Sequence, residues 1–165
     1  MRDFRTIAIF LIGFVFCPSL QAEVIHREKS LYRNIEVRET LNRRCLVFAQ
    51  QRGTRNQTCM DLRDRDLLVF PYVRMTLAGL LVTPEPHNIL IIGIGGGSIP
   101  VTLKELFPDS TIDVVEIDEA VVRVAREYFD FKETPSMKVI VADARVFIKR
   151  AWLKDMTYDL VILDA

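Results

Sequence analysis

The residues that decide the fold run from Asn88 to Asp118, NILIIGIGGGSIPVTLKELFPDSTIDVVEID. They predict a buried strand, a loop with Gly93, Gly95 and Gly97, a helix, and a second strand ending near Glu116. Glycines let a backbone approach a ligand closely, and an acidic residue about 20 residues later can accept both ribose hydroxyls. The pattern therefore predicts a nucleoside-binding site, and its alternative is a tight strand-to-helix turn with a surface glutamate.

The composition sets limits on the size and the partners of the protein. The chain has 165 residues, a formal net charge of zero and 50% hydrophobic residues. This length suits one packed domain with a small appendage. A neutral chain without a basic stripe offers no electrostatic reason to bind nucleic acid, so we expect no nucleic-acid partner.

The first 22 residues have the layout of a signal peptide. Arg2 and Arg5 precede an apolar run, residues 7–17, and a short segment ending at Ala22. The run is short for a membrane span. Cleavage would make the protein periplasmic or secreted. An uncleaved membrane anchor and a buried N-terminal helix, the latter in a cytoplasmic protein, are the alternatives.

The rest of the chain divides into two parts. Residues 23–66 alternate apolar and polar side chains in short runs, which predicts a small antiparallel β unit. Residues 67–165 begin with a helix and then alternate strand and helix, which predicts a parallel sheet. In the β unit we expect strands at 35–40, 44–50 and 57–62. In the second part we expect helices at 67–82, 98–107, 119–128 and 144–153 and strands at 88–93, 111–116, 138–142 and 158–164.

Two cysteines flank the turn around Arg52 and Gly53 at equal distances along the chain. Paired strands would place Cys45 opposite Cys59. In an oxidising compartment the two could form a disulfide, and otherwise they are half-buried thiols. The sequence shows no metal-ligand spacing, so we expect no metal site.

The last strand, residues 158–164, is as apolar as a central strand. An exposed edge of this kind invites pairing with another chain. We therefore expect an incomplete sheet that a longer chain would continue, or a homo-oligomer or partner that covers this strand.

Four carboxylates follow the predicted parallel strands, where ligands bind in such sheets. Glu116 is the candidate ribose ligand, and Asp118 stands beside it. Asp143 could accept from an adenine amino group or could cap the next helix. Asp164 stands where a reacting group would meet the nucleoside, or it is an ordinary loop carboxylate.

The chain resembles the spermidine synthase family, the polyamine aminopropyltransferases. The resemblance implies a Rossmann-like domain of the S-adenosylmethionine-dependent transferase type, in part, after a small β domain. It implies aminopropyl transfer from decarboxylated S-adenosylmethionine to a small-molecule amine in polyamine biosynthesis, without a permanently bound cofactor. Glu116 would then bind ribose, Asp143 adenine, and Asp164 would be catalytic. The resembling segments are 30–35, 89–98, 114–119, 142–144 and 159–164.

Three positions depart from the family pattern. Gly96 stands where the family carries the loop aspartate that holds the donor's amine. Arg33 replaces the glutamine of a Tyr-Gln pair, and Arg74 replaces the glutamate of Tyr-His-Glu. If they face the site, both arginines would repel a polyamine and would suit a carboxylate or a phosphate. Plain surface charge is the alternative.

Two other functions remain open from the sequence. The first is a methyltransferase that uses intact S-adenosylmethionine. Such enzymes usually carry an acidic residue two places before the first loop glycine, and this chain has Ile91 there. The second is an inactive nucleoside-binding fragment, which the missing amine ligands favour.

Overall fold

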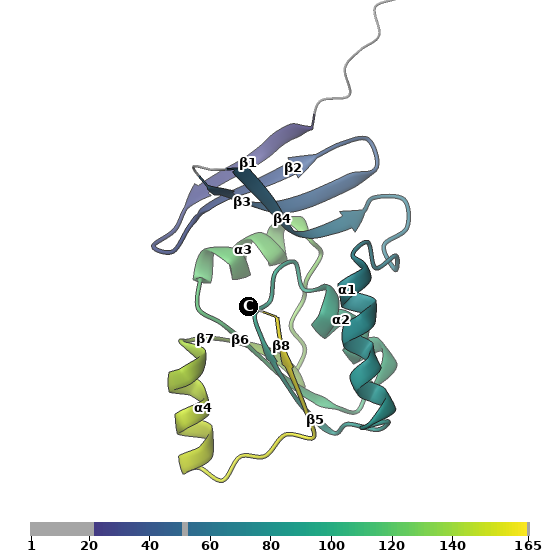
Figure 1. The fold of residues 1–165 in the computed structure, drawn as a ribbon, viewed down its shortest axis with the longest axis vertical. Helices are drawn as coiled ribbons and strands as arrows, with labels where there is room; N and C mark the ends of the chain where they lie inside the picture. Colours follow the sequence, from purple (N-terminus) through teal and green to yellow (C-terminus); the bar gives the residue numbers. More distant parts are fainter. Residues whose placement is uncertain (1–21, 51–52, 165) are drawn as a thin grey trace, which may run out of the picture.

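A computed structural model describes residues 22–50 and 53–164. An antiparallel sheet in the order β1-β2-β3-β4 lies over a mixed layer of helices and a parallel sheet in the order β7-β6-β5-β8 (Figure 1). The predicted α/β class is confirmed. The elements are β1 Glu23–Lys29, β2 Asn34–Glu39, β3 Arg43–Gln50, β4 Gly53–Asp61, α1 Pro71–Thr76, the 3₁₀ helix η1 Leu77–Leu81, β5 Asn88–Ile92, α2 Ser98–Leu106, β6 Thr111–Glu116, α3 Glu119–Tyr128, β7 Met137–Val141, α4 Ala144–Leu153 and β8 Leu160–Leu163.

The β unit has one strand more than the three expected. Strand β1 pairs antiparallel with β2 and forms the edge of the sheet. Its residues, EVIHREK, contain only two strongly apolar side chains, so no alternating pattern marks it. The strand is instead held against α3 by polar contacts. Glu28 pairs with Arg123, and the Tyr128 hydroxyl lies 3.2 Å from Nδ1 of His26.

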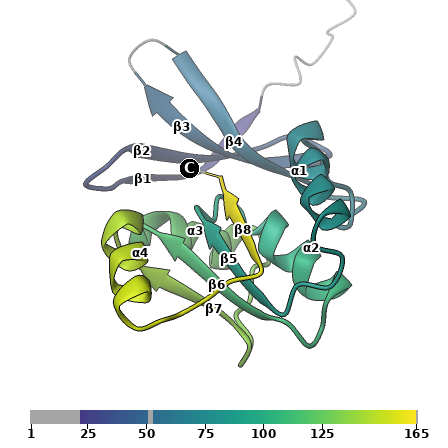
Figure 2. The same cartoon turned by 60° about the horizontal axis from the view of Figure 1, so that its bottom comes forward.

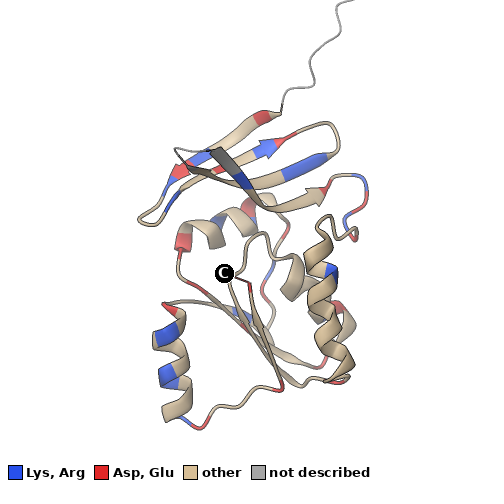
Figure 3. Cartoon of the chain, viewed as in Figure 1, with Lys and Arg blue, Asp and Glu red and all other residues tan. Residues whose placement is uncertain are grey.

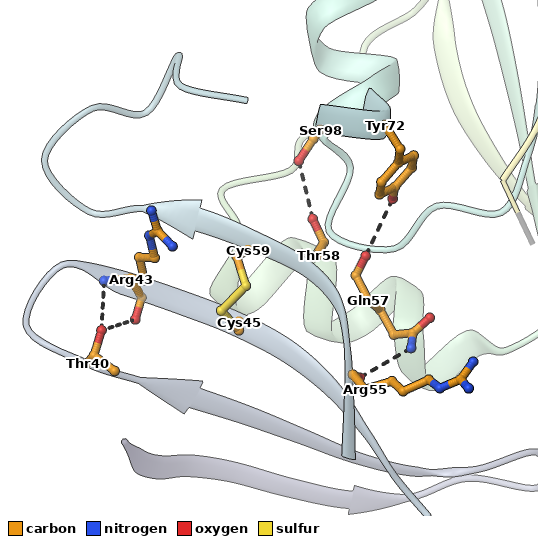
Figure 4. The surroundings of a disulfide bond; sticks show 9 residues. All are labelled: Thr40, Arg43, Cys45, Arg55, Gln57, Thr58, Cys59, Tyr72 and Ser98. Carbon is orange, nitrogen blue, oxygen red and sulfur yellow. Dashed lines mark hydrogen bonds between the residues drawn. A yellow bond between two sulfur atoms is a disulfide. The ribbon is translucent and has the colours of Figure 1, made fainter. Parts of the chain in front are cut away.

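Strands β3 and β4 place Cys45 directly opposite Cys59, as the symmetric spacing predicts. The two sulfur atoms form a disulfide (Figure 4). One step further, the register shifts, because Leu46 pairs with Thr58 whereas Val47 pairs with Asn56. Gln57 is therefore the extra residue of a β-bulge, a feature that bends a strand and redirects its side chains.

The helix expected at residues 67–82 is shorter and irregular. It begins at Pro71, which has no N–H to leave unpaired at the first helical position. It continues from Leu77 to Leu81 as a 3₁₀ helix. The residues before it belong to the connector, where Leu68 forms an isolated bridge with Met60. The apolar character of 67–70 therefore reflects packing in the connector rather than a helical turn.

Helices cover both faces of the parallel sheet (Figure 2). On one face, Ile89, Ile91 and Val114 belong to a buried cluster shared with α2, α3 and the β unit. On the opposite face, Leu90, Ile92 and Val115 pack against Phe147 of α4. This two-sided burial accounts for the continuous apolar sequences of β5 and β6, as predicted for a parallel sheet.

Strand β8 does not have the two-sided burial that its apolar sequence suggested. Among the described residues, β5 is its only neighbour. Ile162 is buried, whereas Val161 is 51% exposed and Leu163 is 75% exposed. Strand β8 is thus an edge of the described sheet, and the side chains of Val161 and Leu163 on one of its faces are exposed. The expectation that another chain or a further segment covers this strand stays a prediction.

The predicted leader lies almost entirely outside the described residues, which begin at Ala22. Within the described part, no helix is both long enough and apolar enough to cross a membrane.

Candidate nucleoside site

The glycine loop turns tightly between β5 and α2. Gly97 has φ +85° and its N–H donates to the Ile94 carbonyl at 2.8 Å, which closes the turn. A Cβ at Gly97 would lie 2.5 Å from a ring carbon of Phe131. Both the backbone conformation and the lack of space therefore require glycine at this position.

Gly96 is also enclosed, by residues far away in the sequence. A Cβ there would lie 2.5 Å from Cγ2 of Thr58 and 3.1 Å from the ring of Phe129. The β unit thus packs directly onto the loop, and Thr58 reaches to within 3.4 Å of the Ser98 hydroxyl (Figure 4). This packing explains the departure at Gly96, because an aspartate would not fit beneath Thr58.

A cavity of about 540 Å³ opens between the loop, the carboxyl ends of the parallel strands and the β unit. Three predicted site carboxylates lie around it, namely Glu116, Asp143 and Asp164. Gly93 and Gly95 also line it, whereas Gly96 and Gly97 face a second cavity of about 400 Å³ behind the loop. The remaining lining residues are Arg33, Phe48, Arg55, Asn56, Gln57, Tyr72, Ile92, Val115, Ile117, Val121, Ala142, Ala144 and Arg145.

Glu116 ends β6 and is 7% exposed. One of its carboxylate oxygens accepts from the Ile94 N–H at 3.1 Å, and the other accepts from the Asp118 N–H at 3.0 Å. The two bonds fix the carboxylate beside the glycine loop. Each oxygen keeps acceptor capacity, so the pair can receive two neighbouring hydroxyl groups.

Asp118 does not line the cavity. It caps α3 by accepting from the Ala120 N–H at 3.1 Å, and its other oxygen accepts from the Ser30 hydroxyl at 2.5 Å. The same oxygen lies 3.7 Å from Nε of Arg33. Asp118 therefore joins the β unit to the parallel sheet and holds Arg33, a structural role.

Asp143 has the helix-capping geometry. Its Oδ1 accepts from the backbone N–H groups of Arg145 and Val146 at 2.8 and 3.3 Å. Its Oδ2 lies 3.0 Å from the Arg145 guanidinium. These contacts lower the pKa of Asp143, chiefly through the side chain of Arg145. The capping alternative is thus present in the structure, while the adenine contact stays a prediction.

Asp164 follows β8, and its N–H donates to the Ile92 carbonyl at 2.8 Å, beside the start of the glycine loop. Its Oδ2 is 3.4 Å from the hydroxyl of Tyr72, which also lies 3.5 Å from the Gln57 carbonyl (Figure 4). Burial raises the pKa of Asp164, and the Tyr72 hydroxyl partly opposes that effect. Burial and the nearby Asp164 raise the pKa of Tyr72 to about 12, so its hydroxyl stays protonated at neutral pH.

The structure separates the two arginines that the sequence grouped. Arg33 lines the cavity and lies 4.3 Å above the ring of Phe48. Arg74 is exposed on α1 and is not among the residues that line the cavity. Arg55 lines it instead, although the sequence placed this residue in a loop. It pairs across the hairpin with Phe48, because β4 begins at Gly53, earlier than the expected strand at 57–62.

Among residues 22–50 and 53–164, no group of three acidic, histidine or cysteine side chains could hold a metal ion. The site consists of carboxylates, arginines, backbone donors and aromatic rings.

The fold is that of the Rossmann-like transferases of the S-adenosylmethionine-dependent type, with a glycine loop after one parallel strand and a buried carboxylate, Glu116, at the end of the next. Residues 71–165 match the model of the spermine/spermidine synthase domain. The chain is 52% identical over 147 residues to a polyamine aminopropyltransferase of Vibrio vulnificus. The matched region covers 88% of this chain and 49% of that protein. The chain belongs to the spermine/spermidine synthase family.

Other comparisons agree on the fold. A crystal structure of spermidine synthase from Thermotoga maritima superposes with a TM-score of 0.62 at 22% identity, over 86% of this chain and 47% of that one. The bovine (Bos taurus) eEF1A lysine and N-terminal methyltransferase is 36% identical over 110 residues, 61% of this chain and 16% of that protein. The chain spans about half the length of the aminopropyltransferase that it matches.

Proposed function

We propose that the protein transfers an aminopropyl group from decarboxylated S-adenosylmethionine to a small-molecule amine. The observation that carries this proposal is the placement of Glu116 and Asp164 around one cavity, beside the glycine loop. Glu116 would hold the ribose, and Asp143 would accept from the adenine amino group. Asp164 would meet the amine. Membership of the family supports the same assignment.

The reaction needs a base at one end of the cavity. The ammonium of the acceptor gives a proton to Asp164, and the free amine nitrogen then attacks the propyl carbon beside the sulfonium. A carbon–nitrogen bond forms, the carbon–sulfur bond breaks, and methylthioadenosine leaves with the electron pair on sulfur. Tyr72 donates to Asp164 and so orients the base. Positioning the two substrates in line supplies much of the remaining acceleration.

An activity assay tests the proposal. The purified protein is incubated with decarboxylated S-adenosylmethionine and putrescine, and methylthioadenosine is quantified by chromatography. Turnover that depends on both substrates supports the proposal. Binding of methylthioadenosine without turnover would instead support the inactive nucleoside-binding reading.

Methyl transfer from intact S-adenosylmethionine is the second candidate. It is favoured by the similarity to the bovine methyltransferase and to human methyltransferase-like protein 13. The crystal structure of the human protein in complex with SAH superposes with a TM-score of 0.52 at 32% identity, over 57% of this chain and 47% of that one. Calorimetric titration distinguishes the candidates, because a preference for the intact compound supports methyl transfer and a preference for the decarboxylated one supports aminopropyl transfer.

Removal of the Glu116 carboxylate is expected to weaken nucleoside binding. Glu116→Ala should cost about 1.5–3 kcal/mol of methylthioadenosine binding, the scale of hydrogen bonds to a charged group. Calorimetry measures the affinity. The affinity of Glu116→Gln should lie between those of the unchanged protein and Glu116→Ala, because glutamine keeps one acceptor oxygen. Equal affinity in Glu116→Ala would place the ribose elsewhere.

The pH dependence of the rate should report the state of Asp164. Because its pKa is raised, the base form is lost as the pH falls, and this loss begins at a higher pH than for an ordinary aspartate. In Tyr72→Phe the hydroxyl that lowers this pKa is absent, so the acidic limb of kcat/KM against pH, which reports the free enzyme, should move to higher pH. A limb at the same pH in both proteins would contradict the contact.

A further inference from the structure

The charged side chains around the cavity do not all have partners. Three are basic, Arg33, Arg55 and Arg145, and three are acidic, Glu116, Asp143 and Asp164. Arg145 pairs with Asp143, and Arg33 lies against Asp118. Glu116 accepts two backbone N–H groups and, in the proposed function, the ribose. Arg55 and Asp164 are the two remaining charged residues lining the cavity, and the described structure shows no oppositely charged partner for either.

Arg55 forms no ion pair with any residue in the described part of the chain. It is exposed and points away from the sheet (Figure 4). It stands two residues before Gln57, whose carbonyl lies near the Tyr72 hydroxyl. The bulge at Gln57 interrupts the alternation of β4, and Arg55, Asn56 and Gln57 all line the cavity.

The surroundings of Arg55 add to its positive character. Its cross-strand neighbour is Phe48, and Arg33 covers the ring of Phe48. The β unit contributes Arg33, Phe48 and Arg55 to the cavity, so this wall is basic and aromatic, although its strands as a whole carry both basic and acidic residues (Figure 3). The opposite wall, from the parallel sheet, carries the acidic groups. The two unpaired charges complement a molecule that has an ammonium group and a carboxylate.

We propose that the acceptor is an amine that also carries a carboxylate, with its amine at Asp164 and its carboxylate at Arg55. This proposal rests on the proposed function and names its acceptor class. A simple diamine would place its second ammonium near Arg55 without compensation. A guanidinium binds a carboxylate through two parallel hydrogen bonds, which also fixes the acceptor's orientation.

The test uses putrescine and ornithine, which differ only by one carboxylate. Each is titrated by calorimetry into the protein saturated with methylthioadenosine. Ornithine should bind about 10- to 100-fold more tightly than putrescine, the factor expected of a charged hydrogen-bonded pair. Arg55→Gln should remove most of that ratio by weakening ornithine alone, and Arg55→Lys should restore part of it. Arg74→Gln, an exposed arginine away from the cavity, is the matched control and should leave the ratio unchanged.

Three results would overturn the proposal: equal affinity for the two amines, an ornithine preference that persists in Arg55→Gln, or no binding of either amine. A second pair, S-adenosylmethionine and its decarboxylated form, tests the donor. A preference for the carboxylated donor that is lost in Arg55→Gln would assign Arg55 to the donor and would also overturn the acceptor proposal. Failure of methylthioadenosine to bind would count against the nucleoside site itself, and is thus a separate outcome.

Discussion

Asp164→Asn is expected to lower the rate of aminopropyl transfer by about 100- to 10,000-fold, the usual contribution of a positioned general base. The amide has nearly the same shape but cannot take the proton of the acceptor's ammonium. Binding of methylthioadenosine should be unchanged, because the substitution leaves Glu116, the proposed ribose ligand, and its two backbone hydrogen bonds in place. The measurement is kcat from product formation, with calorimetry for the nucleoside.

Asp155→Asn provides the matched control for this substitution. Asp155 is exposed in the turn after α4 and has a positive φ of 51°, which asparagine tolerates. Its rate should equal that of the unchanged protein. If Asp164→Asn kept its full rate while the control behaved normally, another group would have to be the base.

Gly97→Ala is expected to give the largest loss of stability in the loop, about 2–6 kcal/mol of unfolding free energy. A left-handed backbone with a side chain costs roughly 1–3 kcal/mol, and overpacking against a buried ring adds about 1–3 kcal/mol. Phe131 cannot move aside easily, because it is 1% exposed within the core cluster. Urea denaturation followed by circular dichroism measures the change.

Gly79→Ala separates this local effect from the general effect of replacing a glycine. Gly79 lies in η1 without a positive φ, and an added Cβ would approach only the end of the Leu160 side chain, at 3.3 Å. Its stability should change by about 1 kcal/mol or less, as is usual away from strained sites. Similar losses of unfolding free energy in the two variants would mean that the Phe131 ring moves aside for the added methyl group, and that the loop is less constrained than its geometry indicates.

Much of the candidate site could be predicted from local patterns. Strands β5 and β6 follow from apolar runs between turn signals, and Glu116 follows from its spacing after the glycine loop. The pairing of Cys45 with Cys59 was predicted correctly from their spacing, but the strands turn between Gln50 and Gly53, and the bulge at Gln57 is what brings Cys59 opposite Cys45. Strand β1 and the break at Pro71 were missed, since an edge strand needs little apolar sequence and a connector can be apolar without being helical.

The strand–loop–helix unit from Asn88 to Asp118 and its family could be predicted from the residues alone, because strand burial, glycine turns and acid spacing are properties of neighbouring residues. The packing in three dimensions was needed to learn which arginines face the cavity and that Thr58 leaves no room beside Gly96. The physical reason is that these outcomes depend on the bulge at Gln57 and on the packing of the β unit over the parallel sheet. Such contacts join residues far apart in the chain. The helical or strand periodicity around each residue does not specify which distant residues its side chain will meet.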